Sequence, residues 1–435
     1  MARILVLSGI QLCTNPRVVK EADTLAEAGY EVEVVGATLE PQLSARDQAL
    51  YKNKQWKYTV LFDAGSPALR DRVRSLAARA RTRFWGEVFA ISGITNPRQL
   101  GLLGPEMLKY ALSKHFDLHV VHNPETLWVG VELLRRGRRV AIDVEDWYSE
   151  DLLPEDRRRY PVAAIRQWEA ALLEGAAYAT TTSKALSQAL SYAYDCSPPA
   201  VMYNSFAWSD RNLIDGRVLD RVDSSSPSLC WFSQVTGAGR GLETLMDSLT
   251  RVNVQFEIHI RGTIRDSYRE SLMARVPADW RTRIHFHPQI PERQLISRIA
   301  EHDVGLAAEI PFCRNKELTV SNKLPFYLLA GLAIVASDTQ GQREVADIAD
   351  GAVDLFSAGD ASSLASALNR VFSNPDRLRK SRQRSLFWAE RVFCWERSAP
   401  VLIEQVQRAL DTTSFSQESR GRPESSDDVT EVATS

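Results

Sequence analysis

Residues 321–338 read SNKLPFYLLAGLAIVASD, and this stretch decides the fold class. Polar residues lead into an apolar run of helical length, and Gly331 ends that helix. An almost wholly apolar run, Ala333–Ser337, follows at once. A strand without polar alternation is covered on both faces, as in a parallel sheet whose strands are joined by helices. The stretch therefore indicates a helix followed by a buried strand of an α/β fold.

Strand patterns alternate with helical patterns along the chain and fall into two series. The first series predicts a helix at about Pro16–Gly29 and strands at Ile4–Leu7, Glu31–Val35, Tyr58–Phe62, Leu118–Val121, Val140–Val144, Tyr178–Thr182 and Ala200–Met202. The second predicts strands at Leu229–Ser233, Gln255–Arg261, Arg283–Phe286, Val304–Ala307, Ala333–Ser337 and Ala352–Leu355, with helices at about Gly241–Leu249, Glu292–Ala300, Lys323–Ala330 and Ser362–Ser373. We therefore predict an α/β protein of two Rossmann-like parallel-sheet domains that face each other across a cleft.

Turn-rich and polar stretches mark the predicted domain boundaries. Residues 1–205 form the N-terminal domain, and 206–228, rich in turn signals, form a linker. Residues 229–390 form the second domain, and 391–410 form a C-terminal helix that can cross back to the first domain. Residues 411–435 contain almost nothing apolar and are predicted to be a disordered tail.

The composition is that of a globular chain with more than one core. The 435 residues are 44% hydrophobic and 25% charged. A net charge of −2 argues against a nucleic-acid binder, which needs a basic surplus. The five cysteines are scattered singly, so neither a zinc site nor a disulfide framework is predicted. No apolar run reaches the ~18 residues of a membrane span, and the short N-terminal one is interpreted as a strand, so a cytoplasmic location is expected.

Residues 230–243, CWFSQVTGAGRGLE, predict a strand, a glycine-rich turn and a helix. Gly237 and Gly239 would let the backbone approach a phosphate, and Arg240 would add a cation with a bidentate fork. A tight turn with a surface arginine is an equally weighted alternative.

A second anion site is predicted where the chain enters the helix at Lys323. Ser321 or Asn322 is expected to cap this helix, so that its free amides and the lysine face one ligand. The alternative is a simple cap beside a solvated lysine.

The stretch 321–338 resembles the segment PNKLFEYLAAGLPVVASD of the family 4 retaining glycosyltransferases, which have the two-domain GT-B fold. The likeness continues in GQREV at 341–345, DASSLASAL at 360–368 and CWE at 394–396. In the first half, NPRVVKEA at 15–22 is similar to the opening helix of the family, and HNPETL at 122–127 to its HDxxTL motif. These motifs occur in the family's order and span nearly the whole chain.

The resemblance implies a donor side, an acceptor side and two catalytic residues. The donor-binding residues are Gly237, Gly239, Arg240, Thr319, Ser321, Asn322 and Lys323. Arg240 and Lys323 neutralise the donor diphosphate, and the amides of Thr319–Asn322 assist them. The resemblance places His122 in the cleft near the transferred sugar. The alternative for His122 is a hydrogen-bonded histidine at a strand end. Glu317 is the candidate catalytic carboxylate. The acceptor-side residues are Gly9, Asn15, Glu145 and Asp146.

Several positions depart from the family's pattern. Phe326 stands in place of the second of the family's two glutamates, so the usual ribose contact is missing or supplied elsewhere. Gln234 stands where many relatives carry an arginine on the phosphate, and residues 145–146 replace a His-Glu pair on the acceptor side. Glu317, rather than Glu309, is our candidate for the first glutamate, because Glu309 closes a strand and comes too early in the alignment.

Residues 66–85 predict a basic amphipathic helix. Its arginines are Arg70, Arg72, Arg74, Arg79, Arg81 and Arg83, against one acid, Asp71. Its apolar stripe consists of Val73, Leu76, Ala77, Ala80 and Phe84. Such a helix can lie on an anionic membrane surface or meet an anionic acceptor. The slightly favoured alternative is the solvated face of a helix packed on its own domain.

Together these features predict a retaining glycosyltransferase that moves a sugar from a nucleotide-diphosphate donor to a glycan or lipid-linked acceptor. No metal or other cofactor is expected, because cationic side chains hold the diphosphate. Peripheral contact with the inner membrane face through Arg70–Arg83 is expected if the acceptor is lipid-linked. The alternatives are a nucleotide-sugar epimerase or sugar phosphorylase of similar fold, and a catalytically silent nucleotide-sugar-binding protein, which the changes at Phe326 and Gln234 favour.

Overall fold

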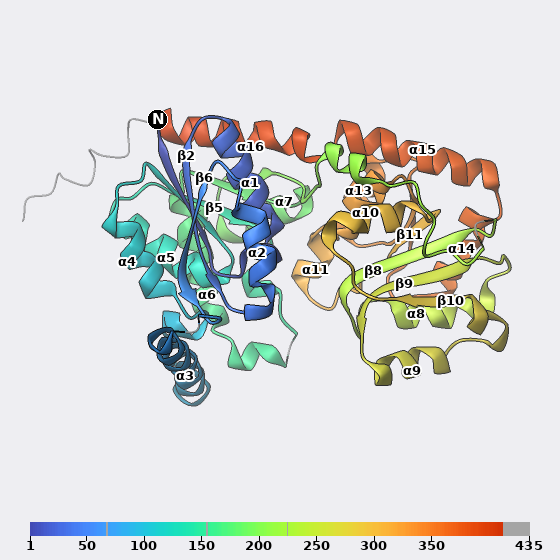
Figure 1. Ribbon diagram of the computed structural model, residues 1–435, viewed down its shortest axis with the longest axis horizontal. Helices are drawn as coiled ribbons and strands as arrows, with labels where there is room; N and C mark the ends of the chain where they lie inside the picture. The colour runs from blue at the N-terminus through green and yellow to red at the C-terminus, as the bar shows by residue number, and fades with distance from the viewer. Residues whose placement is uncertain (67, 154, 224, 412–435) are drawn as a thin grey trace, which may run out of the picture.

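The computed structural model describes residues 1–411 except 67, 154 and 224. The chain forms two parallel sheets, one in each of two domains that lie side by side (Figure 1). The first sheet has the order β3-β2-β1-β4-β5-β6-β7. Its strands are β1 Arg3–Ser8, β2 Glu31–Thr38, β3 Lys57–Asp63, β4 Leu118–His122, β5 Val140–Val144, β6 Tyr178–Thr181 and β7 Ala200–Val201.

The second sheet has the order β10-β9-β8-β11-β12-β13. Its strands are β8 Ser228–Thr236, β9 Glu257–Ile264, β10 Ile284–His287, β11 Val304–Ala307, β12 Ala333–Ser337 and β13 Val353–Phe356. The strand pairs of both sheets are parallel. Two Rossmann-like domains of this kind confirm the predicted fold class.

Helices connect the strands in both domains. Those of the first domain are α1 Pro16–Glu27, α2 Ser44–Tyr51, α3 Leu69–Ser92, α4 Gly104–Ser113, α5 Pro124–Arg135, α6 Val162–Gly175 and α7 Lys184–Tyr194. Those that follow β8 are α8 Leu242–Ser248, α9 Asp266–Ala274, α10 Glu292–Ala300, α11 Arg314–Leu318, α12 Lys323–Ala330, α13 Gln340–Ile348, α14 Ala361–Phe372, α15 Pro375–Arg391 and α16 Trp395–Asp411. Within the described part of the chain, none of them combines the length and apolarity that a membrane crossing requires.

The helix and the strand predicted within residues 321–338 form at the predicted positions, as α12 and β12. α12 ends at Gly331, whose φ of 78° is the left-handed conformation that glycine adopts most easily. Every residue of β12 is buried. Tyr327 of α12 is fully buried against β11, where a Cβ on Gly305 would lie 2.4 Å from its ring. This close approach holds the helix against the sheet.

The chain passes between the domains twice. The segment 206–227, which includes a short 3-10 helix at Trp208–Leu213, leads from the first sheet to the second. At the other end, α15 and α16 run along the same side of both domains (Figure 1), and Trp395 Nε1 donates to Thr24 Oγ1 at 2.8 Å. α16 therefore packs on the first domain. Its last residue is Asp411, so the predicted tail boundary is one residue too early, and residues 412–435 lie outside the described residues.

The basic helix α3 is longer than predicted and exposes its apolar stripe. It packs on its own domain through Ser75 and Ala78, both of which are buried. The large apolar side chains that face solvent are Leu69, Val73, Leu76, Phe84 and Ile91, with exposed fractions between 56% and 86%. As the favoured interpretation has it, the helix packs on its own domain and its described arginines are in solvent, but its large apolar side chains are in solvent as well.

Candidate active site

Two segments of the second domain, the turn after β8 and the start of α13, touch the loop that follows β11. A Cβ on Gly241, in the turn after β8, would lie 2.1 Å from the carbonyl oxygen of Ala308, which follows β11. A Cβ on Gly341, in the first turn of α13, would lie 2.3 Å from the carbonyl oxygen of Thr319 in the same loop. Only glycine permits these approaches. The loop after β11 is thus the centre of the edge at which open parallel sheets bind ligands.

Lys323, the first residue of α12, is paired with a carboxylate in this loop. Its Nζ lies 2.7 Å from Glu309 Oε1, and the Ser321 hydroxyl donates to the same oxygen at 2.8 Å. Burial raises the pKa of Glu309, but Lys323 outweighs burial and the pKa is lowered. Glu309, which sequence reasoning set aside, therefore lies among the predicted donor-binding residues.

The first turn of α12 lacks the predicted side-chain cap. Asn322 stands at the cap position, but no side-chain cap hydrogen bond forms. Its Oδ1 instead accepts from Asn204 Nδ2 at 3.0 Å, and the Ser321 hydroxyl turns to Glu309. The prediction of a cap is wrong because both polar side chains have tertiary partners. In this turn the Leu324 amide already donates to the Ser321 carbonyl at 3.0 Å and Pro325 has no N–H, so the helix N-terminus offers its partial positive charge and the Lys323 amide.

The glycine-rich turn after β8 presents Arg240 to solvent. A Cβ on Gly237 or Gly239 would meet no atom within 4 Å, and Gly239 has a φ of 75°. Arg240 is exposed and donates to Ser233 Oγ at 2.9 Å. The turn thus holds an arginine beside the loop after β11, which Gly241 touches.

The predicted catalytic carboxylate Glu317 lies on α11, on another side of the same loop. Its Oε1 accepts from the backbone amide of Gln340 at 3.1 Å, at the start of α13. The Thr319 hydroxyl donates to the carbonyl oxygen of Asn315 at 2.9 Å. Glu317 and Glu309 therefore have different partners, and only Glu309 touches Lys323.

Phe326 belongs to an aromatic cluster between the linker and the second sheet. Its ring centroid lies 4.7 Å from that of Phe206 and 5.2 Å from that of Phe232. The side chain is buried. The position at which the family carries a glutamate is thus part of the core and offers no polar group to a ribose.

A cluster of buried charges lies behind the carboxyl ends of β4 and β5. Arg17 of α1 donates to both carboxylate oxygens of Asp143. His122 Nε2 lies 3.1 Å from Glu21 Oε2, and its Nδ1 lies 3.4 Å from Asp143 Oδ2 and from Glu145 Oε1. The first four of these residues are each at most 1% exposed. Both ring nitrogens of His122 thus face carboxylates of the protein.

The surrounding carboxylates keep His122 protonated. Burial lowers the pKa of His122, but Glu21 and Glu145 outweigh burial and raise the pKa to about 10. Burial likewise opposes ionisation of Asp143, yet Arg17 holds its pKa below the ordinary value. The structure places His122 behind Glu145 rather than at the cleft surface, as a buried cation that holds this carboxylate.

Two further acceptor-side residues lie at the same edge of the first sheet. Asn15 Nδ2 donates to Glu145 Oε1 at 3.0 Å, and Asn15 Oδ1 caps α1 by accepting from the Val18 amide. The Glu145 side chain keeps 17% of its surface exposed. Gly9 follows β1, and a Cβ there would lie 2.4 Å from Cβ of Glu125. Glu145 is thus the solvent-facing end of the charge cluster.

Asp146 joins the two domains. Asn315 Nδ2 donates to Asp146 Oδ1 at 2.6 Å, and Asn315 Oδ1 accepts from the Trp147 amide at 2.8 Å. Lys316 Nζ lies 3.1 Å from Asp151 Oδ1 and 3.7 Å from Asp146 Oδ1. We predicted Asp146 on the acceptor side; its carboxylate is instead bound by α11 of the second domain.

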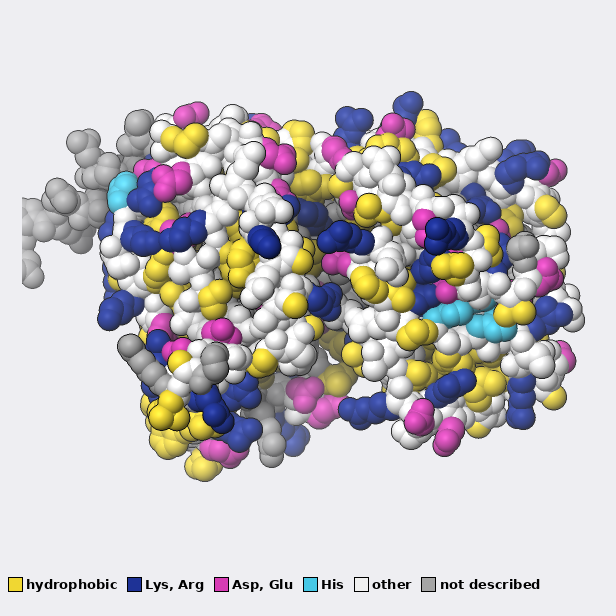
Figure 2. Space-filling model, viewed as in Figure 1, with side chains coloured by type: hydrophobic (Ala, Val, Ile, Leu, Met, Phe, Trp, Pro, Cys, Tyr) yellow, Lys and Arg dark blue, Asp and Glu magenta, His cyan; other side chains and the backbone are white. Residues whose placement is uncertain are grey.

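A second contact between the domains uses Glu344 of the GQREV motif. Its carboxylate accepts from the amides of Lys184 and Ala185, each at 3.0 Å, at the start of α7. Ser183 Oγ donates to the Leu318 carbonyl at 2.7 Å. Figure 2 shows the surface hollowed between the domains. Sequence reasoning missed Asn315 and Glu344 as interdomain residues, because their partners are far away in the sequence.

Two groups among the described side chains could hold a metal ion. One consists of Glu21, His122 and Asp143, and the other of Glu257, His259 and His285. Arg17 already occupies the Asp143 carboxylate in the first group, so a metal ion does not fit there. The second group lies towards the amino ends of β9 and β10, whereas the turns described above lie at carboxyl ends.

The comparisons with known proteins identify the fold. No protein-family model matches the chain, and no curated protein matches it. Sucrose-phosphate synthase from Thermosynechococcus elongatus has a TM-score of 0.68 and 15% identity, over 94% of this chain and 99% of that one. HepE from Anabaena, solved in complex with UDP, has a TM-score of 0.67 and 15% identity, over 94% and 100%. A UDP-forming α,α-trehalose-phosphate synthase from Burkholderia xenovorans has a TM-score of 0.64 and 14% identity, over 94% and 99%. The chain therefore has the two-domain GT-B fold.

Proposed function

We propose that the chain is a retaining glycosyltransferase that takes its sugar from a nucleotide-diphosphate donor. The observation that carries the proposal is the grouping of Arg240, Lys323 and the uncapped first turn of α12 around the loop after β11. Two cations beside the positive end of a helix suit a diphosphate. The UDP in the HepE complex makes a nucleoside diphosphate the first ligand to test.

In the proposed reaction the diphosphate is the leaving group. The bond from the anomeric carbon to the diphosphate oxygen breaks, and negative charge grows on that oxygen. Arg240, Lys323 and the positive end of α12 stabilise this charge from fixed positions. A metal ion or other cofactor is not part of the proposal, because these groups supply the positive charge.

Glu317 is the carboxylate proposed to act on the sugar. Positive character builds at the anomeric carbon as the bond to the diphosphate stretches, and a nearby carboxylate stabilises it. Glu317 lies on α11, within the loop after β11, and α11 also contacts the first domain through Asn315. Glu309 is its rival, because it already touches Ser321 and Lys323.

Glu145 is the proposed acceptor-side carboxylate. It is the exposed end of the buried cluster, and both Asn15 and His122 face its Oε1. His122 thereby acts as a positioning residue, which holds Glu145 without contact with the sugar. A carboxylate fixed in this way can orient an acceptor hydroxyl.

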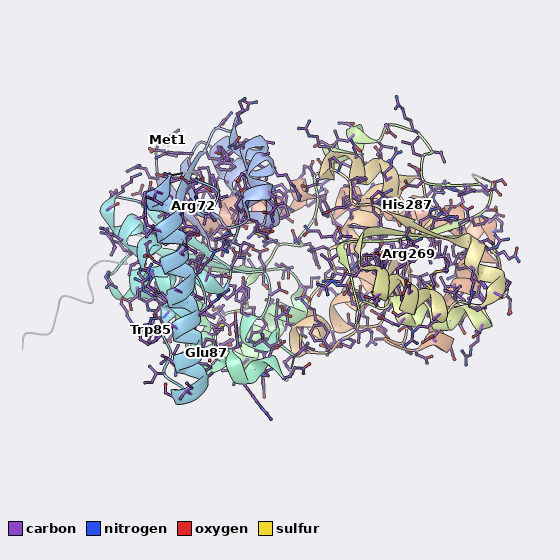
Figure 3. The ribbon with its side chains drawn as sticks, turned by 60° about the horizontal axis from the view of Figure 1, so that its bottom comes forward. Met1, Arg72, Trp85, Glu87, Arg269 and His287 are labelled. Atoms are coloured by element: carbon purple, nitrogen blue, oxygen red, sulfur yellow. The ribbon has the colours of Figure 1, made fainter. Side chains whose placement is uncertain are left out.

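The exposed face of α3 supports an acceptor at a membrane surface, either lipid-linked or a precursor of a bacterial surface glycan. Leu69, Val73, Leu76, Phe84 and Ile91 fall on one face at about 100° per residue. Arg72, Arg79 and Arg83 border one side of this face, and Arg74 and Arg81 the other. Figure 3 shows α3 along the outside of the first domain, with Arg72, Trp85 and Glu87 labelled. An apolar stripe between arginines suits an anionic membrane surface, here the inner face of the cytoplasmic membrane.

Ligand binding followed by product analysis tests the proposed function. Wild-type protein is heated with UDP, GDP or ADP, and one of them is expected to raise the melting temperature, because it binds only the folded state. The matching nucleotide sugar is then incubated with soluble and lipid-linked acceptors. Free nucleoside diphosphate together with an acceptor that carries the sugar in the donor's anomeric configuration supports the proposal.

Product analysis also distinguishes the alternative functions, because proteins of one fold can catalyse different reactions. An altered sugar still attached to the nucleotide would identify an epimerase. Sugar phosphate formed only with inorganic phosphate would identify a phosphorylase. Nucleotide binding without any turnover would identify a catalytically silent binding protein, and no binding of any nucleotide would exclude the donor site.

A further inference from the structure

Four of the seven histidines of the chain gather in the second domain. They are His259 on β9, His285 and His287 on β10, and His302 just before β11. His259 and His285 are direct neighbours across the two parallel strands, so their side chains share one face of the sheet. Figure 2 shows histidine side chains at the surface of the second domain, and Figure 3 labels His287 there.

The side chains of Glu257, His259 and His285 converge. Their ligand atoms all lie within 4.8 Å of one another. His259 Nε2 is 3.2 Å from Glu257 Oε2, and His285 Nε2 is 3.9 Å from Glu257 Oε1. Tetrahedral coordination at about 2.0–2.1 Å separates ligand atoms by about 3.3 Å, so Glu257 and His259 already have this spacing. His285 lies on the edge strand β10 with 21% of its side chain exposed, so it can close the remaining gap.

Three polar contacts connect Asp220, His287, His259 and Glu257, and they need one more hydrogen than two neutral imidazoles carry. The three contacts are Asp220 Oδ1 to His287 Nδ1 at 3.5 Å, His287 Nε2 to His259 Nδ1 at 2.9 Å, and His259 Nε2 to Glu257 Oε2 at 3.2 Å. Each contact needs one hydrogen, and two neutral imidazoles carry only two. A metal cation between His259 and Glu257 would satisfy the third contact.

His285 provides an independent observation. Its Nε2 is buried and has no hydrogen-bond partner among the residues that the structure describes. Buried polar atoms are rarely left in this state. A cation held by Glu257 and His259 would give this nitrogen a ligand bond.

We propose that Glu257, His259 and His285 form a zinc site that is separate from the active site. Imidazole and carboxylate are ligands that Zn²⁺ accepts, and a water molecule can take the fourth position. With zinc on His259 Nε2, the His259 Nδ1–H donates to His287 and the His287 Nδ1–H donates to Asp220, so every contact has its hydrogen. Such outer partners orient a ligand histidine. The site joins edge strand β10 to β9 and, through Asp220, ties the interdomain segment to the second domain.

Zinc binding to four versions of the full chain tests the proposal. The site variants are Glu257→Gln and His285→Ala, and the control is His115→Ala, which removes an exposed histidine of the first domain. Each protein is freed of metal with a chelator and dialysed against Zn²⁺ alone, and bound zinc is measured by mass spectrometry. Wild type and the control are expected to bind one zinc per chain and to gain melting temperature from it. Both site variants are expected to bind zinc at least tenfold more weakly.

Two further measurements distinguish the proposed zinc site from the proposed donor site. Co²⁺ in place of zinc is expected to give wild type the visible absorption of a tetrahedral centre, and His285→Ala is expected to lose it. His285 is partly exposed on an edge strand, so His285→Ala is expected to fold and to keep the wild-type shift with a nucleoside diphosphate. The proposal is overturned if wild type binds no zinc, or if Glu257→Gln and His285→Ala bind it as tightly as wild type does.

Discussion

Lys323 Nζ lies 2.7 Å from Glu309 Oε1, so the cation that begins α12 is held by a carboxylate of the loop after β11. The two charges neutralise each other in the absence of a ligand. A diphosphate at the first turn of α12 would share Lys323 with Glu309. We therefore expect changes at Lys323 and Glu309 to affect donor binding together, which no spacing in the sequence indicated.

Loss of either donor-side cation is expected to weaken nucleoside-diphosphate binding. A charge-assisted hydrogen bond contributes about 1.5–3 kcal/mol, so Arg240→Ala and Lys323→Ala should each cost about 10–100-fold in affinity. The matched control is Arg135→Ala, which removes an exposed arginine paired with Glu132 on α5. Calorimetric titration measures affinity, and thermal unfolding checks the fold. Wild-type affinity in both site variants would rule out the proposed donor site.

The two glutamates of the loop after β11 are expected to affect different kinetic constants. Glu317→Gln should lower kcat at saturating donor, because the proposed carboxylate loses its charge while its volume is kept. Glu309→Gln should mainly change KM for the donor, because it releases Lys323 from its ion pair. Steady-state kinetics of both variants separate these effects. If Glu309→Gln abolishes turnover and Glu317→Gln stays near wild type, our assignment of the catalytic carboxylate is wrong.

Sugar transfer is expected to persist after exhaustive chelation. Arg240, Lys323 and the positive end of α12 supply the positive charge at the proposed donor site, and the proposed zinc ligands lie towards the opposite ends of the strands. EDTA should therefore lower the melting temperature and leave the transfer rate at a temperature well below melting nearly unchanged. A rate that disappears with EDTA and returns with magnesium or manganese would contradict this.

The exposed face of α3 is expected to bind anionic membranes. Burying one large apolar side chain contributes about 1.5–3 kcal/mol, so Leu76→Glu and Phe84→Glu should each weaken binding about tenfold or more. Tyr192→Glu, at an exposed aromatic residue on α7, is the control and should bind like wild type. Cosedimentation with vesicles of a neutral lipid, with and without an anionic lipid, measures binding. Equal sedimentation of wild type with both vesicle types would argue against electrostatic attachment.

The buried cation at His122 is expected to make stability depend on pH. The pKa of His122 is raised in the folded protein from about 6.5 to about 10, so its contribution is complete below the lower value and is lost as pH rises towards the upper one. His122→Gln should lower the free energy of unfolding by about 3–5 kcal/mol at neutral pH, because Glu21 and Asp143 lose a buried partner. Urea unfolding of both proteins across this pH range gives the difference. A difference that stays constant with pH would contradict the proposed charge state.

Much of the secondary structure could be predicted from the sequence. β5, β11 and β12 have the predicted bounds, because a buried parallel strand is a local run of apolar residues. Nine of the described helices were not predicted, namely α2, α4, α5, α6, α7, α9, α11, α13 and α15. α9 buries only Leu272, so it leaves a weak apolar period in the sequence.

The candidate site could be predicted only in part. Gly239 and Gly331 adopt positive φ where turns were predicted, since a turn depends on a few adjacent residues. The partners of the charged residues could not be predicted in this way. Asn15 and His122 meet at Glu145 only because α1, β4 and β5 come together in the fold.

The sequence by itself determined the α/β class, the two domains and the turns at the strand ends, because apolar periods and glycines act over a few residues. Only the tertiary structure decided that Asn315 binds Asp146 across the domains, that α3 turns Leu76 to solvent, and that His259 meets His285. Hydrogen bonds, ion pairs and burial depend on distance in space. Residues that are far apart in the sequence are brought together by the path of the folded chain. No short-range sequence pattern specifies that path.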